Sequence, residues 1–457
     1  MQEETMTLAE SFVLLLSERR FQELRRTAVE ENPADIAEAL GELTPEACRI
    51  IYRFLPKELA AEVFVEMTHE GRKALVHSFS DFELREVLDE LYDDDTADLI
   101  EEMPASVVKR ILKNTSPETR RSVNQLLKYS EDSAGSIMTT EFVHLRREMT
   151  VSDALAIIRR DAINKETVYT CYVTDKQRRL LGIVTAKDLL ISPLDATMES
   201  IMESNVIAAN TTDNREEVAR MFDKYDFLAL PVVDKENRLV GIITVDDAID
   251  VLSEEVEEDF AKIAAITPNE TPYLKTSVLS IWRARIPWLL LLMLSATFTG
   301  MIISAFEGAL AQVVVLAAFI PMLMGTGGNS GSQASVTVIR GLSLGEVQFS
   351  DFLRVVFKEL RVSVLCGIAL AAVTFGKIWL VDYLLLDQPI TMPIAFVISI
   401  TLAVTVIVAK LIGSILPLLA KKLGFDPAVM ASPFITTLVD ALSLLVYFGI
   451  AQAVLHL

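Results

Sequence analysis

Five apolar segments in the C-terminal part of this 457-residue chain limit its possible folds more than any other feature. They lie at about residues 287–306, 309–339, 362–381, 390–420 and 427–455. Each reaches the roughly 20 residues with which a helix crosses about 30 Å of hydrocarbon. The sequence therefore predicts a transmembrane domain of five helices at residues 276–457. Because five is odd, we expect the chain termini on opposite sides of the membrane.

Basic residues predict the orientation of these spans. They precede the first and fifth spans and separate the second span from the third, at Arg283, Arg285, Arg340, Arg354, Lys358, Arg361, Lys421 and Lys422. The other two connections, around Glu307 and at residues 382–389, lack Lys and Arg. Because basic loops stay in the cytosol, we expect a cytosolic N-terminal half and an external C-terminus. The acidic start, MQEETMTLAE, does not resemble a signal peptide.

Charge divides the chain into two parts. Residues 275–457 hold 11 of the 42 Lys and Arg residues and 8 of the 63 Asp and Glu residues, a net charge of +3. Residues 1–274 keep 31 basic and 55 acidic residues, a net charge of −24. Such a surface repels nucleic acid and concentrates cations, although it also serves solubility alone. The three cysteines and four histidines show no catalytic spacing, so we do not expect an enzyme.

Apolar residues recur every 12 positions in the first 130 residues, in series that start at Ala39, Leu40 and Leu43. Prolines at positions 45, 56, 104 and 117 interrupt the pattern. This period predicts a helical solenoid at residues 1–130, in which short helices stack to bury a continuous seam. Solenoids commonly bind proteins. The acidic run at residues 93–98 suggests a cation site instead, or simply a solvated helix start.

A second duplication occupies residues 136–251. The segment SIMTTEFVHL at 136 matches SIMESNVIAA at 200, and VTDKQRRLLGIVTAKDLL at 173 matches VVDKENRLVGIITVDDAI at 232. Each copy is predicted to contain a helix, two apolar strands joined by a polar turn, and a closing helix. The strings GIVTAKD and GIITVDD resemble those of a tandem pair of CBS domains, which we place at residues 131–198 and 199–252.

The CBS resemblance implies a site for an adenine nucleotide such as ATP. In that family the Thr and Asp of the string hold the ribose, here Thr185 with Asp188, or Thr244 with Asp247. The candidate nucleotide contacts are Thr185, Asp188, Phe227 and Tyr169. The alternative is that both aspartates merely cap helices.

An acidic amphipathic helix follows the second copy and leads towards the membrane, and we place the acidic connecting helix at residues 253–275. Its carboxylates are Asp246, Asp247, Asp250, Glu254, Glu255, Glu257, Glu258 and Asp259. Acids so close together repel each other unless a cation neutralises them. Divalent cations would do so, and a solvated acidic face is the alternative.

Asp440 is the one Asp, Glu, Lys or Arg residue in the last 31 positions. A carboxylate inside a spanning helix costs roughly 2.5–3.5 kcal/mol on insertion scales and usually faces a partner, a cavity or an ion path. Asp440 is therefore the first candidate for a cation site. The competing interpretation is an ion pair with Lys410 of the fourth span.

The second span carries GTGGNSGSQASVTVIRG, in which Asn329 and Gln333 share one helix face. Their amides can hold the water of a hydrated ion, and counting along the helices places them and Asp440 in the same half of the bilayer. Gly327 and Gly331 permit a close helix approach, and this spacing is also a plain packing motif.

The strings GGNSGSQAS with VIRGL, and SPFITTLVDALS, resemble those of the MgtE family of magnesium channels, and the order of parts matches over nearly the whole chain. The resemblance implies a homodimer in the bacterial inner membrane, with a central pore where Asp440 from both subunits holds hydrated Mg²⁺. The candidate pore residues are Asp440, Asn329, Gln333, Gly328 and Pro433.

The same resemblance implies acidic sites that bind regulatory Mg²⁺ and close the pore when cytosolic magnesium is ample. The candidates are Asp94, Asp98, Glu62, Glu216, Asp226, Asp246, Asp247, Asp250, Glu254, Glu255, Glu258, Asp259 and Asp426. Oxygen ligands favour a hard ion such as Mg²⁺. Two alternatives remain: a gradient-coupled transporter of Mg²⁺ or Co²⁺, and a CBS-regulated signalling protein without transport. The expected fold class is mainly α, with an α+β regulatory part.

Overall fold

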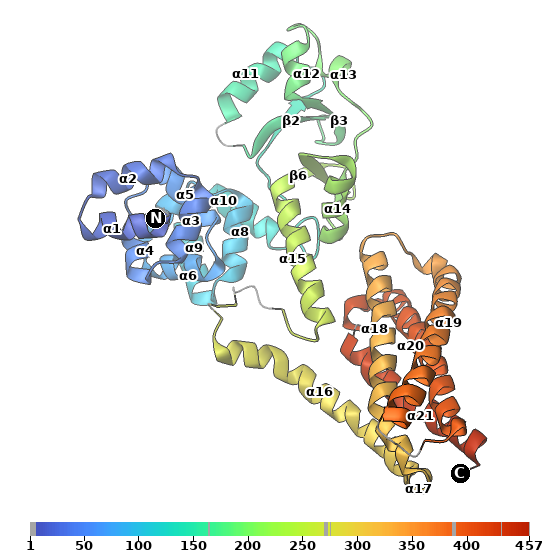
Figure 1. Ribbon diagram of the computed structural model, residues 1–457. Helices are drawn as coiled ribbons and strands as arrows, with labels where there is room; N and C mark the ends of the chain where they lie inside the picture. The colour runs from blue at the N-terminus through green and yellow to red at the C-terminus, as the bar shows by residue number, and fades with distance from the viewer. Residues whose placement is uncertain are drawn as a thin grey trace. The chain divides into compact units, whose positions relative to one another are not determined.

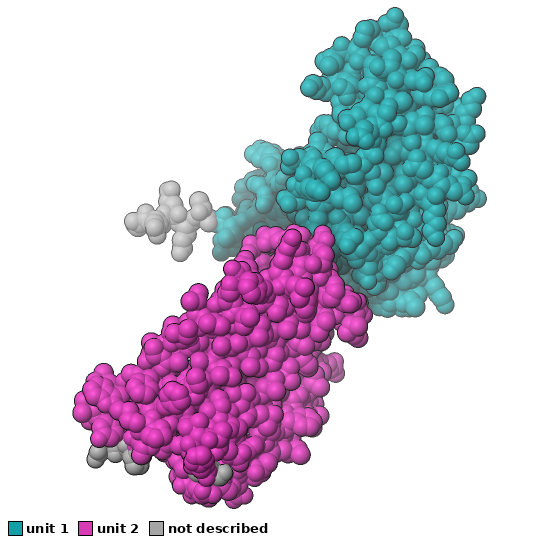
Figure 2. All heavy atoms as spheres, turned by 90° about the vertical axis from the view of Figure 1, so that its right-hand side faces the viewer, with its two compact units in different colours: residues 1–255 teal, residues 256–457 magenta. Residues whose placement is uncertain are grey.

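The computed structural model describes residues 6–162, 165–268, 273–274, 276–385, 390–430 and 432–456. The chain divides into two compact units, residues 1–255 and 256–457, which Figure 2 colours separately. Of the predicted connecting helix at 253–275, residues 269–272 and 275 lie outside the described residues, as do residues 386–389 of the predicted outer connection at 382–389. The helix is shorter than predicted, because it ends at Ile263 and Ala265 adopts a left-handed conformation with φ = 52°.

The first unit begins with ten short helices, α1 to α10, wound into a solenoid (Figure 1). Their bounds are Leu8–Ser17, Phe21–Glu30, Pro33–Gly41, Pro45–Tyr52, Lys57–Val65, His69–Ser78, Asp81–Leu88, Asp93–Glu102, Ala105–Asn114 and Pro117–Leu126. Pro45 and Pro117 stand in the first turn of α4 and α10, where a missing N–H costs no hydrogen bond. Pro56 and Pro104 immediately precede α5 and α9. The prolines therefore start helices, as the sequence predicts.

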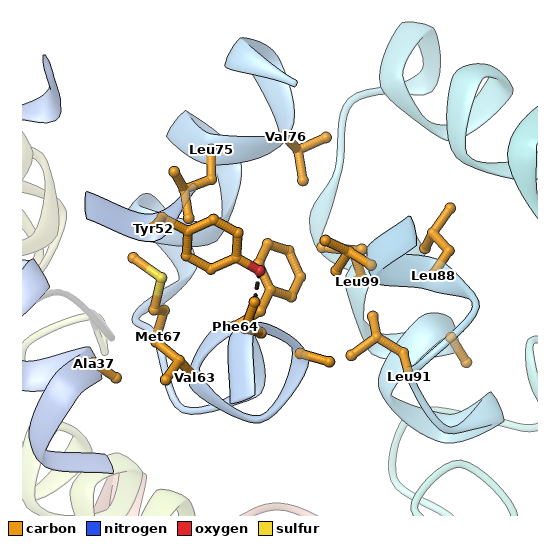
Figure 3. Close-up of a cluster of buried hydrophobic side chains, with 14 of the residues drawn as sticks. Ala37, Tyr52, Val63, Phe64, Met67, Leu75, Val76, Leu88, Leu91 and Leu99 are labelled. Carbon is orange, nitrogen blue, oxygen red and sulfur yellow. Dashed lines mark hydrogen bonds between the residues drawn. The ribbon is translucent and has the colours of Figure 1, made fainter. Parts of the chain in front are cut away.

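The 12-residue period marks the core of this solenoid. In the series that starts at Ala39, Ile51, Val63 and Ile111 are fully buried. Figure 3 shows part of the cluster, with Val63, Leu75 and Leu99 of this series beside Tyr52 and Phe64 of the neighbouring series. Tyr52 Oη donates a hydrogen bond of 2.7 Å to the Ala60 carbonyl, which satisfies its buried polar end. The predicted continuous seam is confirmed.

Two α/β repeats complete the first unit. The first contains β1 (Phe142–Arg146), α11 (Val151–Asp161), β2 (Thr167–Thr174), β3 (Leu180–Thr185) and α12 (Ala186–Ile191). The second contains α13 (Met198–Ile201), β4 (Ala209–Asn210), α14 (Arg215–Tyr225), β5 (Ala229–Val233), β6 (Leu239–Thr244) and α15 (Val245–Ile263), which continues beyond the first unit. Each sheet gains a strand that we did not predict, because β1 and β4 pair parallel to β2 and β5.

The repeats pack reciprocally. A Cβ on Gly182 would lie 2.8 Å from Met202 Sδ, and one on Gly241 would lie 2.7 Å from Met138 Sδ. Thus the Ser-Ile-Met segment of each copy covers the glycine of the other. The turns also exchange backbone hydrogen bonds, because Leu180 N–H donates to Asn237 O and Leu239 N–H donates to Arg178 O. The two copies therefore form one body.

Among the described residues of the second unit, five helical segments are long and apolar enough to span a membrane, as predicted. Their main helices are α16 (Val278–Ala305), α18 (Ile320–Ser343), α19 (Phe352–Lys377), α20 (Met392–Lys422) and α21 (Ser432–Leu455). A short π-helix, Ile378–Leu385, extends α19. The predicted run 309–339 is interrupted, because α17 (Glu307–Gln312) and a 3₁₀-helix, Val314–Phe319, precede α18. Pro321 in the first turn of α18 favours a new helix there.

Helix α20 is central in this unit. It packs against α18, α19 and α21, and α18 packs against α21 (Figure 1). The apolar interior includes Leu323 of α18, Ile398 of α20 and Phe448 of α21. The mainly helical architecture with an α+β part confirms the predicted fold class.

Candidate ion pathway and acidic clusters

Glycines bring α18 into close contact with its neighbours. A Cβ on Gly327 would lie 2.7 Å from Thr405 Cγ2 of α20 and 2.9 Å from Ser443 Oγ of α21. A Cβ on Gly331 would lie 2.8 Å from Ile435 Cγ2. The interpretation of this pair as a packing motif is therefore confirmed. Gly328 is also buried and faces Thr436, so any pore role of Gly328 would belong to its backbone.

The opposite face of α18 is polar and exposed. Asn329 and Gln333 are both exposed in the single chain, and so is Thr337, whose Oγ1 donates a hydrogen bond of 2.7 Å to the Gln333 carbonyl. In the part of the chain that the structure describes, no hydrogen bond reaches the amide groups of Asn329 and Gln333. Amides on a membrane-spanning helix need water or protein as a partner. This face therefore suits a water-filled path.

Asp440 lies on α21 at the level of this polar face. The adjacent Val439 contacts the sites of both Gly327 and Gly331, which flank Asn329 along α18. The Asp440 side chain is half-buried, and no described residue forms an ion pair or hydrogen bond with its carboxylate. Lys410 is buried on α20, and the described residues contain no ion pair between it and Asp440. The alternative of an Asp440–Lys410 pair is therefore wrong in this structure.

Pro433 lies at the start of the same helix. Its carbonyl accepts hydrogen bonds from the hydroxyls of Thr436 at 2.9 Å and Thr437 at 3.0 Å. Pro433 stands in the first turn of α21, seven residues before Asp440, where its missing N–H costs no hydrogen bond and its fixed φ favours the helix start.

The first unit holds a dense group of carboxylates, which we call the α8 cluster. It consists of Asp94, Asp95 and Asp98 on α8, Glu141 and Glu166 from the first repeat, and Asp247 at the start of α15. Burial, followed by mutual repulsion, raises the pKa of every member: to about 6 for Asp94, about 7 for Asp98, Glu141 and Asp247, and about 8 for Asp95 and Glu166. At neutral pH the cluster therefore lacks the nearby positive charge that would keep all of its carboxylates ionised.

Several oxygens of the α8 cluster lack partners. Asp94 Oδ1, Glu141 Oε2 and Glu166 Oε2 are buried without a hydrogen bond. By contrast, the adjacent Asp93 accepts a bond of 3.0 Å from Thr140 Oγ1. Sequence reasoning missed Glu141 and Glu166, because no local motif marks them and the fold alone brings them to α8.

A second group, which we call the Lys262 cluster, lies near the end of α15. It consists of Glu258, Asp259, Lys262 and Asp426, the last of these just before α21. Lys262 Nζ lies 2.6 Å from Glu258 Oε1 and 2.5 Å from Asp426 Oδ2. Ser343 Oγ donates a hydrogen bond of 3.3 Å to Asp259 Oδ2. Burial and the nearby Asp426 carboxylate raise the pKa of Asp259.

Other predicted acids have local partners. Glu254 and Glu255 pair with Arg215 at 3.2 and 3.6 Å, and Glu216 pairs with Arg220. Burial and the neighbouring Asp246 raise the pKa of Asp250.

Two of the predicted regulatory ligands lie apart from both clusters. Asp226 ends α14 in a left-handed conformation with φ = 54°, and Glu62 is exposed on α5. Neither is a member of the α8 cluster or the Lys262 cluster.

The two Thr-Asp pairs of the repeats both cap helices. Thr185 Oγ1 donates to Asp188 Oδ2 at 2.5 Å, and Thr244 Oγ1 donates to Asp247 Oδ2 at 2.5 Å. Asp247 belongs to the α8 cluster, whereas Asp188 does not. Phe227 stacks on Tyr225 with ring centroids 5.3 Å apart, and Tyr169 is 67% exposed.

Within the described ranges, no three His, Cys, Asp or Glu side chains converge as a ready-made metal site. The carboxylates of both clusters instead lie in looser groups. This arrangement suits a cation that keeps part of its water shell, as Mg²⁺ commonly does.

Family models match separate parts of the chain in both units. A model described as a divalent cation transporter, MgtE, covers residues 320–450. The MgtE intracellular N domain covers residues 31–132, and CBS domains cover residues 134–194 and 198–254. The magnesium transporter MgtE of Thermus thermophilus is 37% identical over 98% of this chain and 99% of its own length. The chain belongs to the MgtE family.

Other MgtE proteins support this assignment. The magnesium transporter MgtE of Bacillus subtilis is 35% identical over 97% of this chain and 96% of its own length. A crystal structure of the cytosolic domain of the Mg²⁺ channel MgtE in complex with ATP has 39% identity and a TM-score of 0.51, and covers 53% of this chain and 100% of its own. With its five candidate spans, this MgtE family member is a multi-pass membrane protein. The transporter names of its relatives agree with the expectation of a non-enzymatic role.

Proposed function

We propose that this chain is a magnesium channel that forms a homodimer and is closed by cytosolic Mg²⁺. The observation that carries the proposal is the unpaired Asp440 carboxylate at the level of the exposed Asn329 and Gln333 amides, inside a chain that belongs to a family of divalent cation transporters. A two-fold axis would turn one carboxylate per chain into a pair. Such a pair can hold Mg²⁺ through its retained waters.

The proposed orientation follows from the basic residues of the sequence. They place the N-terminal unit in the cytosol and the C-terminus outside. The α8 cluster and the Lys262 cluster would then face cytosolic Mg²⁺. A cation that binds these carboxylates in their gathered arrangement stabilises that arrangement by mass action, which supports closure when cytosolic Mg²⁺ is ample.

We also propose ATP as a ligand of the CBS pair. In this proposal the Asp188 carboxylate accepts hydrogen bonds from the ribose, and the exposed Tyr169 and the Phe227 ring supply aromatic surface for the base. The related cytosolic domain named above was crystallised with ATP.

The test is Mg²⁺ uptake into liposomes that contain the purified protein, at a set membrane voltage and without a proton or sodium gradient. We expect Asp440→Asn to lower uptake by about tenfold or more, because the variant lacks the fixed negative charge on the proposed path. Glu346→Gln removes the same charge from an exposed loop and should retain uptake. Normal uptake by Asp440→Asn would reject the pore role. Uptake that requires an imposed gradient would favour a coupled transporter, and a wild-type protein without uptake would favour a signalling protein.

A further inference from the structure

The Lys262 cluster contains its own cation. The Lys262 ammonium lies between Glu258 on its own helix and Asp426 on the segment before α21. Its side chain is 23% exposed, and those of its two partners are 39% and 34% exposed. A lysine ammonium is charged at physiological pH, and this one lies within ion-pair distance of both carboxylates.

This ammonium joins two segments that are far apart in sequence. Glu258 and Asp259 belong to the last turns of α15, and Asp426 precedes the helix that carries Asp440. Asp426 is itself fixed, because its Oδ1 accepts a hydrogen bond of 2.8 Å from Ala428 N–H. A lysine in this position bridges carboxylates in the way that a bound divalent cation would bridge them.

We propose that Lys262 is a resident counter-ion of the cation site formed by Glu258, Asp259 and Asp426, where it holds the end of α15 in place without a divalent cation and sets how much divalent cation the site needs. The proposal rests on the proposed function of this cluster as a regulatory site. It adds a residue that none of the predicted ligand sets contains.

Charge balance gives the proposal its consequence. Three carboxylates and one ammonium leave two negative charges, which a single divalent cation balances. Without the ammonium, three negative charges remain. They repel each other more strongly when no cation is bound, and they attract a divalent cation more strongly when it is present. Loss of Lys262 should therefore weaken the cation-free contact and lower the concentration of Mg²⁺ that restores it.

Hydrogen exchange of the segment 256–266, measured by mass spectrometry on the full-length protein in nanodiscs, tests this. In EDTA we expect Lys262→Gln to exchange about fivefold faster than the wild type, the scale of one half-exposed ion pair. Added MgCl₂ should restore the protection of Lys262→Gln against hydrogen exchange. The variant should need a lower MgCl₂ concentration for this than the wild type needs for its own slowing of exchange. Lys262→Arg keeps the charge and should resemble the wild type. Lys358→Gln, which neutralises an exposed lysine elsewhere, should change nothing in this segment.

Two outcomes would overturn the proposal. Equal exchange of Lys262→Gln and the wild type in EDTA would show that the ammonium does not hold the helix. Restoration that needs more Mg²⁺ than the wild type would show that Lys262 does not reduce the attraction of the site for the cation. Hydrogen exchange is measured separately from Mg²⁺ uptake. Failure of the Asp440→Asn uptake experiment would therefore reject the transport proposal, and the exchange of Lys262→Gln would still test the role of Lys262.

Discussion

Gly413 of α20 lies against the carbonyl oxygen of Gly331 of α18, so closely that a Cβ at position 413 would sit 2.2 Å from that oxygen. The same α18 glycine faces Ile435 of α21. The spacing of three helices around the candidate ion path therefore depends on two residues without side chains.

We expect Gly413→Ala to push α20 away from α18 and to destabilise the transmembrane unit by about 1–3 kcal/mol, the usual cost of overpacking. Thermal unfolding of the detergent-solubilised protein, followed by tryptophan fluorescence, measures this, because all three tryptophans lie in the second unit. Gly376→Ala is the control, since nothing lies within 4 Å of an added Cβ there. Equal melting temperatures of the two variants would contradict the packing role.

The solenoid offers a test with adjacent isoleucines. Ile51 is fully buried, whereas Ile50 is 38% exposed. We expect Ile51→Ala to lower the free energy of unfolding by about 3 kcal/mol, through lost burial and a cavity. Ile50→Ala should lower it much less. Pulse proteolysis of the full-length protein in urea measures both. Similar losses would mean that the 12-residue period does not mark the core.

The α8 cluster predicts a pH dependence. Burial raises the pKa of Asp95 and Glu166 to about 8 and of Asp98 to about 7, so the folded cluster binds more protons than the unfolded chain does. Stability that is present at low pH is therefore lost as pH rises through these values. In EDTA we expect hydrogen-exchange protection of α8, corrected for the intrinsic rate, to fall between about pH 6 and pH 8.

Divalent cation should suppress this fall, because it replaces the protons. Asp95→Asn should flatten the profile, whereas Asp89→Asn, which changes an acid beyond the cluster at the end of α7, should preserve it. Protection that rises with pH in EDTA would show that the carboxylates are not buried together.

The two Thr-Asp pairs predict where a nucleotide binds. Asp247 lies among acids that would repel phosphate, and Asp188 does not. We expect Asp188→Asn to raise the Kd for ATP about tenfold through lost hydrogen bonds to a charged acceptor, and Asp247→Asn to leave it unchanged or lower it. Calorimetric titration of the full-length protein with ATP distinguishes these results. A larger loss of ATP affinity from Asp247→Asn would place the nucleotide at Thr244 and Asp247 instead.

The sequence predicts the fold well where a period repeats. The 12-residue series gives the solenoid seam, with Ile51, Val63 and Ile111 fully buried as expected. Prediction fails where strands are short or breaks are local. Strand β4 has two residues, too few to show alternation, and the break before α18 depends on the backbone at Val313.

Some residues of the candidate sites could be predicted from the sequence, and others could not. Asp440 stands out because a lone charge in an apolar segment is visible in sequence, and the acids of α15 stand out as a run. Glu141, Glu166 and Lys262 carry no such signal, because their roles arise from tertiary contacts between distant segments. A lysine in an acidic helix looks like an ordinary solubilising residue until its partner Asp426 is located.

Helix α15 runs without interruption from Val245 to Ile263, a length of about 29 Å at 1.5 Å per residue. It carries Asp247 of one carboxylate group near its first residue and Lys262 of the other near its last. A continuous helix is a stiff rod, so tilting or rotating it at one end displaces the other. Under the proposed function we therefore expect magnesium bound at one group to change the affinity of the other, so that the two respond as a coupled pair and not as separate detectors.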